Sequence, residues 1–512
     1  TIRTELHNAV AAHGGTIVTT DDVDAGNVDV VFSIIPSGDT DAEAFTLTHR
    51  GTGSDAILHV TAAHARGLLY GLYHVVRLGE HAFVGCEMTT SPERHAPHTN
   101  LRMLDHWDNI AVDPVTGQVE RGYSGGSIFY DQGSVRADLS RVSQYARLLA
   151  ASGINRVTVN NVNVGPLETR LIGDMLPDLA RIANEFRPYG ITTHVSVSWD
   201  APARLDGLDT TDPFDANVQG WWREAADRVW ATIPDFGGFV ITADSEGQPG
   251  PLAYGRSPAD GANMLSQAVA PHGGLIHWRA FDCNHEQDWR DRTTDRVKAA
   301  SEHFAPYDGT FADNVIVQIK HDPLNFHDRE AVSPVIAAMP NTRVAAEFQV
   351  PTEYLGHQKH GVYLGRMWSE LLNFPYFAAG AINGHRTMAD IVAGHHPDTP
   401  SGRLTVGGLA AVSNVGDSHC LTCRPLAQAN LYAWGRLAWD PTSDPIDILD
   451  DWSRLTFPDA PSSVHRTVHA TLDESWETDK TPNATDWHDT INTYFYRHSD
   501  IADQQSRTIH SP

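Results

Sequence analysis

Six polar clusters recur along the chain, and each lies at the end of a short apolar run. They combine carboxylates, amides, cations and tryptophan, in the segments 105–109 (DHWDN), 160–163 (NNVN), 244–250 (DSEGQPG), 277–279 (HWR), 320–325 (KHDPLN) and 347–349 (EFQ). Hydrolysis of a glycosidic bond needs one carboxylic acid to protonate the leaving oxygen, and a second carboxylate to act as nucleophile or to activate water. Aromatic faces stack on sugars, and Asn, His and Arg bond their hydroxyls. The residue types therefore indicate carbohydrate chemistry, provided that the fold brings the clusters together.

The apolar runs themselves predict a fold that does so. Eight of them recur at intervals of roughly 30–50 residues, at 101–104, 157–160, 193–198, 239–243, 275–281, 315–320, 344–350 and 377–382. Stretches compatible with helices lie between most of them, at 139–151, 176–186, 218–232 and 291–303. Eight strands that alternate with helices are the pattern of a (β/α)8 TIM barrel. Active sites of such barrels lie at the carboxyl ends of the strands, which is where the polar clusters fall.

The barrel accounts for the middle of the chain only. Residues 1–95 are predicted to form an N-terminal α/β accessory domain, with strands at 28–35 and 56–60 and a helix at 62–78. Residues 96–400 form the predicted catalytic barrel. Residues 401–512 are predicted to form a C-terminal helical region, because 426–439 and 447–455 have helical patterns and the strand signal fades.

Composition excludes several classes of function. The 512 residues carry a net charge of −27, with 64 acidic against 37 basic side chains, and such a surface repels nucleic acid. No uninterrupted apolar stretch approaches the ~18 residues of a membrane span. Cys420 and Cys423 form one C-x2-C motif, but no second pair follows to complete a zinc site, and no other metal spacing is present. We therefore expect neither a metal nor another cofactor.

The remaining expectations concern location and partners. Residues 1–8 have neither the basic cluster nor the apolar segment of a signal peptide, which favours a cytoplasmic protein, although the chain opens with Thr. The expected partner is an oligosaccharide substrate, with no nucleic acid and no membrane. A homodimer is left open.

Several motifs resemble those of a known family. They include ERGYSGGSIF (120–129), SEGQPGP (245–251), HGGLIHWRAF (272–281), EFQVPTEYLG (347–356) and LAQANLYAWGRLAWDP (426–441). In this order, and over nearly the whole chain, they closely resemble the α-glucuronidases of glycoside hydrolase family 67. The resemblance implies an inverting, metal-independent enzyme that releases 4-O-methyl-D-glucuronic acid, α-1,2-linked to the terminal xylose of xylo-oligosaccharides. It also implies that Glu246 is the general acid and that Glu347 belongs to a Glu–Asp pair acting as the base.

Two positions depart from the family pattern. The family has approximately K-x-G-P-I-D-F around its second base, where this chain has KHDPLNF (320–326), so the expected Asp is Asn325. The family also has a Lys four residues before its acid, where this chain has Thr242. Arg279 and Lys320 match two other cationic contacts to the sugar carboxylate. Two alternatives therefore stay open. One is a related α-glycosidase that acts on another uronic acid or a neutral sugar, and the other is a catalytically impaired sugar-binding homologue.

The individual residues also have alternative roles. The predicted catalytic residues are Glu246 and Glu347, and the predicted substrate-binding residues are Trp107, Asn161, Arg279, Lys320, Asp322 and Asn325. Glu347 could instead be an ion-pair partner inside the barrel, for Arg279 or Lys320. Trp107 could belong to the core, Asp322 could be structural, and Asn160, Asn161 and Asn163 could cap the following helix.

Two distances are expected from the mechanism. Inversion requires the carboxyl groups of Glu246 and Glu347 to stand roughly 6.5–9.5 Å apart, which leaves room for a water molecule. A sugar carboxylate requires a paired cation, so Arg279 and Lys320 should converge within ~4 Å of one point.

Overall fold

The structure is a computed structural model of the chain. It describes residues 1–11, 16–17, 30–36, 41–50, 57–82, 91–112, 125–245, 247–280, 296–322, 332–351, 361–377, 385–394, 406–413, 415–422 and 424–479.

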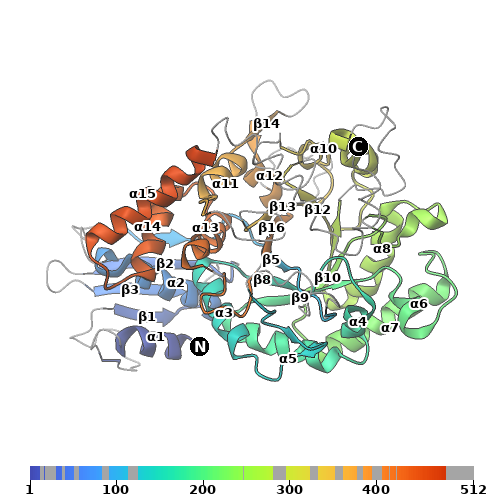
Figure 1. The fold of residues 1–512 in the computed structure, drawn as a ribbon, viewed down its shortest axis with the longest axis horizontal. Helices are drawn as coiled ribbons and strands as arrows, with labels where there is room; N and C mark the ends of the chain where they lie inside the picture. Colours follow the sequence, from blue (N-terminus) through green and yellow to red (C-terminus); the bar gives the residue numbers. More distant parts are fainter. Residues whose placement is uncertain are drawn as a thin grey trace.

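Eight parallel strands close into a barrel at the centre of the molecule (Figure 1). In order around the barrel, they are β5 (Arg102–His106), β8 (Arg156–Val159), β9 (Thr192–Val197), β10 (Gly238–Ile241), β11 (Leu275–Arg279), β12 (Val315–Lys320), β13 (Val344–Gln349) and β16 (Gly408–Ser413). The last strand, β16, pairs with the first, β5, from Leu409↔Arg102 to Ser413↔His106. The predicted (β/α)8 barrel is confirmed, and seven of its strands lie where the apolar runs predicted them.

The eighth strand was predicted in the wrong place. Residues Pro375–Phe377 form β14, which pairs antiparallel with β15 (His385–Thr387) outside the barrel, and 378–382 lie outside the described residues. The eighth barrel strand is β16, which lies beyond residue 400, where the barrel was expected to end. Its sequence, GLAAVS, is short and rich in small residues, so it resembles a strand only weakly. The glycine that begins the strand is required, since a Cβ on Gly408 would stand 2.6 Å from Leu101 Cδ2 and 2.9 Å from the Leu101 carbonyl oxygen.

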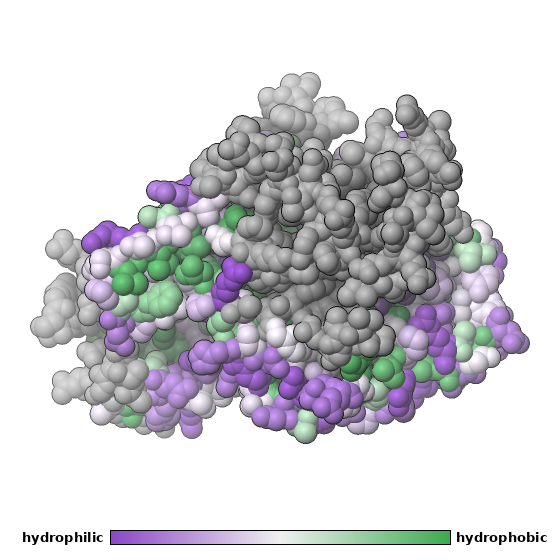
Figure 2. Space-filling view, in the orientation of Figure 1, coloured by the Kyte–Doolittle hydropathy of each residue, from purple (hydrophilic) through white to green (hydrophobic). Residues whose placement is uncertain are grey.

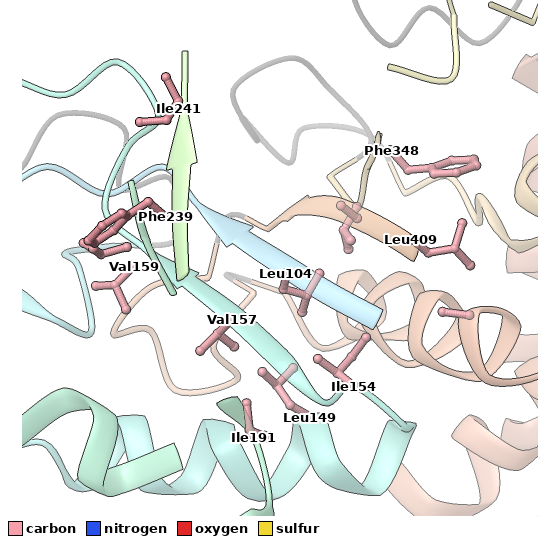
Figure 3. Packing of buried hydrophobic residues seen from close by; sticks show 14 of the residues in the cluster. Leu104, Leu149, Ile154, Val157, Val159, Ile191, Phe239, Ile241, Phe348 and Leu409 are labelled. Carbon is pink, nitrogen blue, oxygen red and sulfur yellow. The ribbon is translucent and has the colours of Figure 1, made fainter. Parts of the chain in front are cut away.

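Helices cover the outside of the barrel. They are α3 (Ser140–Ser152), α4 (Pro166–Thr169), α5 (Leu176–Phe186), α6 (Ala201–Asp206), α7 (Ala216–Thr232), α8 (Pro258–Val269), α9 (Arg296–Phe304), α10 (Val335–Ala338), α11 (Gly365–Leu372) and α12 (Met388–Ala393). Their apolar faces meet the outward side chains of the strands; Leu149 of α3, for example, belongs to the same buried cluster as Leu104 and Val157 (Figure 3). Alternation along each strand sends the other set of side chains into the barrel.

A small α/β unit precedes the barrel. Its sheet has the order β1-β3-β2-β4, with β1 (Val30–Ile34), β2 (Phe45–Arg50), β3 (Ile57–Ala62) and β4 (Glu93–His95). Helices α1 (Ile2–Ala11) and α2 (Ala65–Leu78) accompany it. The sequence predicted β1, β3 and α2 but not β2, β4 or α1.

Among the described residues, three α-helices follow the barrel, namely α13 (Gln428–Trp439), α14 (Pro445–Thr456) and α15 (Ser462–Asp479). The helices predicted at 426–439 and 447–455 correspond to the first two. These helices and the N-terminal sheet lie at one end of the molecule (Figure 1). Trp439 of α13 packs into the core of that sheet. Hydrophilic side chains are frequent on the surface around α3 and α5 (Figure 2). Among the described residues, no helix combines the length and apolarity that a membrane span requires.

Arg102 connects these three parts of the molecule. It begins β5, is fully buried, and donates from Nη2 to the Glu43 carboxylate of the N-terminal unit at 2.7 Å. It also donates to the Gly153 carbonyl oxygen at 2.6 Å, and its guanidinium carbon lies 4.9 Å from the Trp439 ring centroid in α13. The start of the strand that carries the first polar cluster is thereby anchored to both flanking units.

We predict that Arg102→Met lowers the free energy of unfolding by roughly 3–5 kcal/mol, because Glu43 then stays buried without its main cation. Urea unfolding followed by circular dichroism measures the loss. Arg170→Met is the matched control, since the Arg170–Asp174 pair is exposed and such pairs contribute little. Equal losses in the two variants would contradict the role assigned to Arg102.

Candidate active site

The polar side chains of five strands meet above an apolar layer inside the barrel. Met103, Ile316 and Ala345 belong to this inner layer. Two residues further along the same strands, and therefore on the same inward face, are Asp105, Gln318 and Glu347. The carboxyl ends of the barrel strands thus carry a buried polar cluster, as the sequence predicted.

Glu347 is the centre of this cluster. Its side chain is 1% exposed and accepts two hydrogen bonds from Arg279, from Nε to Oε2 at 2.8 Å and from Nη2 to Oε1 at 2.7 Å. Gln318 donates from Nε2 to Oε2 at 2.6 Å. Burial alone would raise the pKa of Glu347, but the charge and hydrogen bonds of Arg279, together with Lys320 and Gln318, lower it below the ordinary value. The carboxylate is therefore ionised at neutral pH.

Arg279 joins Glu347 to two other predicted positions. It ends β11, is 2% exposed, and donates from Nη1 to the hydroxyl oxygen of Thr242 at 3.1 Å. Its guanidinium carbon lies 5.7 Å from the Trp107 ring centroid, within the range of a cation–π contact. The ion pair between Arg279 and Glu347 is thus present. An ion-paired carboxylate can still accept a proton, so this pairing is compatible with both roles considered for Glu347.

Lys320 stands beside Glu347 on the neighbouring strand. The two are register partners between β12 and β13, and the charge of Lys320 contributes to the lowered pKa of Glu347. Arg279 and Lys320 therefore both act on one described carboxylate, and their convergence on a sugar carboxylate stays a prediction. Asp322 follows β12 and is 2% exposed. His321 lies between Lys320 and Asp322, and its backbone N–H donates to the Glu347 carbonyl oxygen at 2.8 Å.

Asn161 is buried beside Trp107. Its Nδ2 donates to the Trp107 carbonyl oxygen at 3.3 Å, and its Oδ1 accepts from the backbone N–H of Asn163 at 2.9 Å. Its contacts tie the turn after β8 to the segment after β5. The N-cap of α4 is Gly165, so Asn161 does not have the capping role considered for it.

Two predicted residues, Glu246 and Asn325, lie outside the described residues, so the spacing of the two catalytic carboxyl groups stays a prediction. The chain on both sides of Glu246 is nevertheless constrained. Asp244 has a φ of +54°, and its carboxylate accepts from the backbone N–H of Leu252 at 3.2 Å. A Cβ on Gly250 would stand 2.3 Å from this carboxyl group, so a larger residue at position 250 would displace the Asp244 side chain from its place.

Sequence reasoning assigned no role to Gln318, Asp105 or His277. Gln318 donates from Nε2 to Asp105 Oδ2 at 2.7 Å as well as to Glu347, and its Oε1 lies 3.1 Å from His277 Nδ1. Burial, and then the charge of Glu347, raises the pKa of Asp105 to about 7. The signal for Gln318 was present, since a glutamine interrupts the apolar run VIVQIK two residues before Lys320.

Only one cysteine of the C-x2-C motif is described, and no hydrogen bond among the described residues joins its side chain to the polar cluster. Cys420 forms no disulfide, and Cys423 lies outside the described part of the chain. Within that described part, no group of three or more His, Cys, Asp and Glu side chains could hold a metal ion.

Comparison with known proteins identifies the family. The sequence matches the glycosyl hydrolase family 67 middle domain over residues 84–420, and the C-terminus of the same family over residues 422–482. The chain belongs to glycosyl hydrolase family 67. The family-67 resemblance of the motifs is thereby confirmed, and the barrel-mouth cluster lies within the matched middle domain.

Curated relatives agree with this membership. Alpha-glucuronidase A of Emericella nidulans is 44% identical over 404 residues, which are 78% of this chain and 46% of that protein. Probable alpha-glucuronidase A of Neosartorya fischeri is 42% identical over 464 residues, which are 88% of this chain and 52% of that protein. The family-67 chain thus spans about half the length of these relatives. Among solved structures, the GH20 exo-β-N-acetylglucosaminidase from Vibrio harveyi has a TM-score of 0.48 at 10% identity. The match covers 91% of this chain and 72% of that chain. This likeness is too distant to inform function.

We predict that Arg279→Met destabilises the protein by roughly 3–5 kcal/mol at pH 7, because it leaves Glu347 buried and uncompensated. In the wild type the lowered pKa of Glu347 stabilises the fold at pH values above the pKa that this glutamate has in the unfolded chain. This stabilisation is lost as the pH falls through the lower pKa that Glu347 has in the folded protein. The gap in the free energy of unfolding between wild type and variant should therefore narrow as the pH falls below the ordinary pKa of a glutamate and through the lowered pKa of Glu347.

Urea unfolding at pH 7 and at the lowest pH at which both proteins are folded measures this gap. Arg187→Met, which breaks the exposed Arg187–Asp235 pair, is the matched control. A loss in Arg279→Met that is the same at both pH values would show that the arginine acts through packing rather than through its charge.

Proposed function

We propose that this family-67 chain is an inverting α-glucuronidase that releases glucuronic acid, or its 4-O-methyl derivative, from xylo-oligosaccharides. The observation that carries the proposal is Glu347, a buried carboxylate kept ionised by Arg279 at the carboxyl end of a barrel strand. Relatives that are 42–44% identical carry the name alpha-glucuronidase A, and this supports the choice of substrate.

In the proposed reaction, Glu246 donates a proton to the glycosidic oxygen as the bond from that oxygen to the anomeric carbon breaks. A water molecule forms the new bond to the anomeric carbon from the opposite face, and its proton passes to Glu347. The products are the free uronic acid, with inverted configuration, and the xylo-oligosaccharide with its hydroxyl restored. Fixed donors around Glu347 suit this step, because they orient the base before the reaction begins.

The proposal of an anionic sugar depends on the two cations of the site. Arg279 and Lys320 place two cations around Glu347, and a carboxylate that leaves water requires such partners. In this proposal Trp107 contributes a stacking face, and Asn161, Asp322 and Asn325 contribute polar contacts to hydroxyl groups. Thr242, whose hydroxyl oxygen accepts a hydrogen bond from Arg279, occupies the position of the lysine that precedes the acid by four residues in the family pattern.

We predict that Glu246→Gln lowers kcat on natural aldouronic acids by about 10²–10⁴-fold, because an amide cannot protonate the leaving oxygen. Aryl α-glucuronides with good leaving groups should lose much less, since they depart without protonation. Steady-state kinetics on both substrates measure the difference. Glu224→Gln, an exposed glutamate on α7, is the control and should behave as wild type. Equal losses on both substrates would remove Glu246 from the acid role.

We predict that Glu347→Ala abolishes hydrolysis and that Asn325→Asp increases it, because a second carboxylate near the attacking water makes the pair a stronger base. Release of uronic acid measures both changes. Unchanged activity in Glu347→Ala would place the base elsewhere, with Asp322 the first candidate. A wild type without activity beside an active Asn325→Asp variant would identify an impaired sugar-binding homologue. If the protein hydrolysed only neutral α-linked disaccharides, the substrate assigned to it would be a neutral sugar instead of a uronic acid.

A further inference from the structure

Two loops at the carboxyl end of the barrel carry exposed apolar side chains. The first joins α6 to α7 beyond the end of β9 and contains Phe214, which is 54% exposed. The second joins β10 to α8 and contains the short 3-10 helix η5 (Pro251–Tyr254), in which Leu252 is 40% and Tyr254 is 37% exposed. Apolar side chains that are scattered singly over a surface are normal, whereas a group of them indicates a binding surface. These three side chains form such a group if the two loops are held together.

Two sets of contacts hold the loops together. The backbone N–H of Thr211 donates to Tyr254 Oη at 3.0 Å, and the Thr211 hydroxyl oxygen lies 3.1 Å from the same oxygen. Next to this pair, Arg256 donates to both carboxylate oxygens of Asp212, from Nε and from Nη2, each at 3.2 Å. The helices α7 and α8 that follow the loops also pack against each other (Figure 1). Phe214 and Tyr254 therefore belong to one surface.

The Phe214 ring is held with one face open. The guanidinium carbon of Arg256 stands over this ring, 4.2 Å from its centroid, which is a cation–π contact. The backbone N–H of Phe214 donates to Asp212 Oδ1 at 3.0 Å, so the ring and the cation are attached to the same carboxylate. Because the arginine covers one face and the side chain is 54% exposed, the other face is available to a ligand. A ring that is ordered before binding loses little entropy when a ligand stacks on it.

This surface is connected to the loop of the proposed general acid. Helix η5 begins five positions after Glu246, and the backbone N–H of Leu252 donates to the Asp244 carboxylate at 3.2 Å. In the proposed reaction Glu246 protonates the oxygen that departs with the xylose chain, so this chain lies on the side of the site where the acid stands. A surface that continues the acid's loop, at the same end of the barrel, is therefore on the side of the leaving chain.

We propose that Phe214 and Tyr254, with Leu252 beside them, form a distal binding platform for the leaving chain, which takes xylose units beyond the one that carries the uronic acid. The inference rests on the proposed function. A xylose ring is uncharged and presents C–H groups on its faces, which suits the open face of an aromatic ring. The chemistry of the platform thus differs from that of the cations Arg279 and Lys320, and the platform contacts no reacting atom.

A distal platform makes the reaction sensitive to the length of the leaving chain. Contacts far from the reacting bond bind the substrate and the transition state equally, so they lower KM and leave kcat unchanged. Two substrates with the same uronic acid, one on xylobiose and one on xylopentaose, separate the platform from the rest of the site. We expect the wild type to have the lower KM for the longer substrate.

The first test measures kcat and KM of Phe214→Ala on these two substrates. We expect the KM for the longer substrate to rise several-fold to about tenfold, with kcat unchanged, because one stacking contact is lost. Both constants for the shorter substrate should stay at the wild-type values, and Phe214→Trp should restore the KM for the longer one. An unchanged KM for the longer substrate, or an equal change for both substrates, overturns the inference.

Phe374→Ala is the matched control. Phe374 is also an exposed phenylalanine, at 40%, and it follows α11 in the sector of β13, which stands four strands from β9 in either direction around the barrel. This variant should keep the wild-type preference for the longer substrate. A loss of the preference in Phe374→Ala as large as in Phe214→Ala overturns the inference.

Isothermal titration calorimetry with unsubstituted xylopentaose tests the platform without hydrolysis. We expect the wild type and Phe374→Ala to bind it, and Phe214→Ala to bind it several-fold more weakly. If the wild type hydrolyses no α-glucuronide, the proposed function fails while this titration still decides whether the platform binds xylose units. Equal affinity in wild type and Phe214→Ala overturns the inference. A change of oligomeric state in Phe214→Ala, measured by analytical ultracentrifugation, also overturns it, because the surface would then be a contact between protein chains.

Discussion

The buried ion pair between Arg279 and Glu347 is the interaction on which the rest of the candidate active site depends. A carboxylate this deeply buried is tolerated only when a cation and further donors compensate for the lost water. The two residues come from β11 and β13, with β12 between them. Gln318 and Lys320 of β12 fill the gap, one donating to Glu347 and the other adding positive charge. Three neighbouring strands therefore act as one unit, and they orient the proposed base.

The opposite wall of the site depends on β5, which carries Asp105 and leads into Trp107. This strand is positioned by Arg102 at its start, through contacts with Glu43 and Trp439 in the flanking units. At its other end, the carboxylate of Glu168 accepts from the backbone N–H groups of Ile110 and Ala111 at 2.6 and 2.9 Å. The accessory units of this family-67 chain thus contribute to the site by anchoring one strand.

The fold was largely predictable from the sequence because barrel strands, buried on both faces, form apolar runs that alternate with helices. β16 was missed since its alanines and glycine fit a crowded position and carry little strand signal. The polar clusters predicted Arg279, Lys320 and Glu347 together, because position at a strand end depends on local sequence alone. The sequence offered the pair of Glu347 with Arg279 or Lys320 only as an alternative, since the choice of partner depends on which strands stand two apart in the closed barrel. Gln318 was missed, and Asp105 was placed in a polar cluster without a role of its own, for the same reason: one amide joins strands that are remote in sequence.

The central claim is that Glu347 directs a water molecule to the anomeric carbon in a single displacement. Proton NMR during hydrolysis of an α-linked aldouronic acid tests this most directly, because it distinguishes the anomers of the released uronic acid before they equilibrate. A single displacement predicts that the β-anomer is formed first. Initial formation of the α-anomer would mean retention through a covalent intermediate, and would contradict the role of Glu347 as a water-activating base.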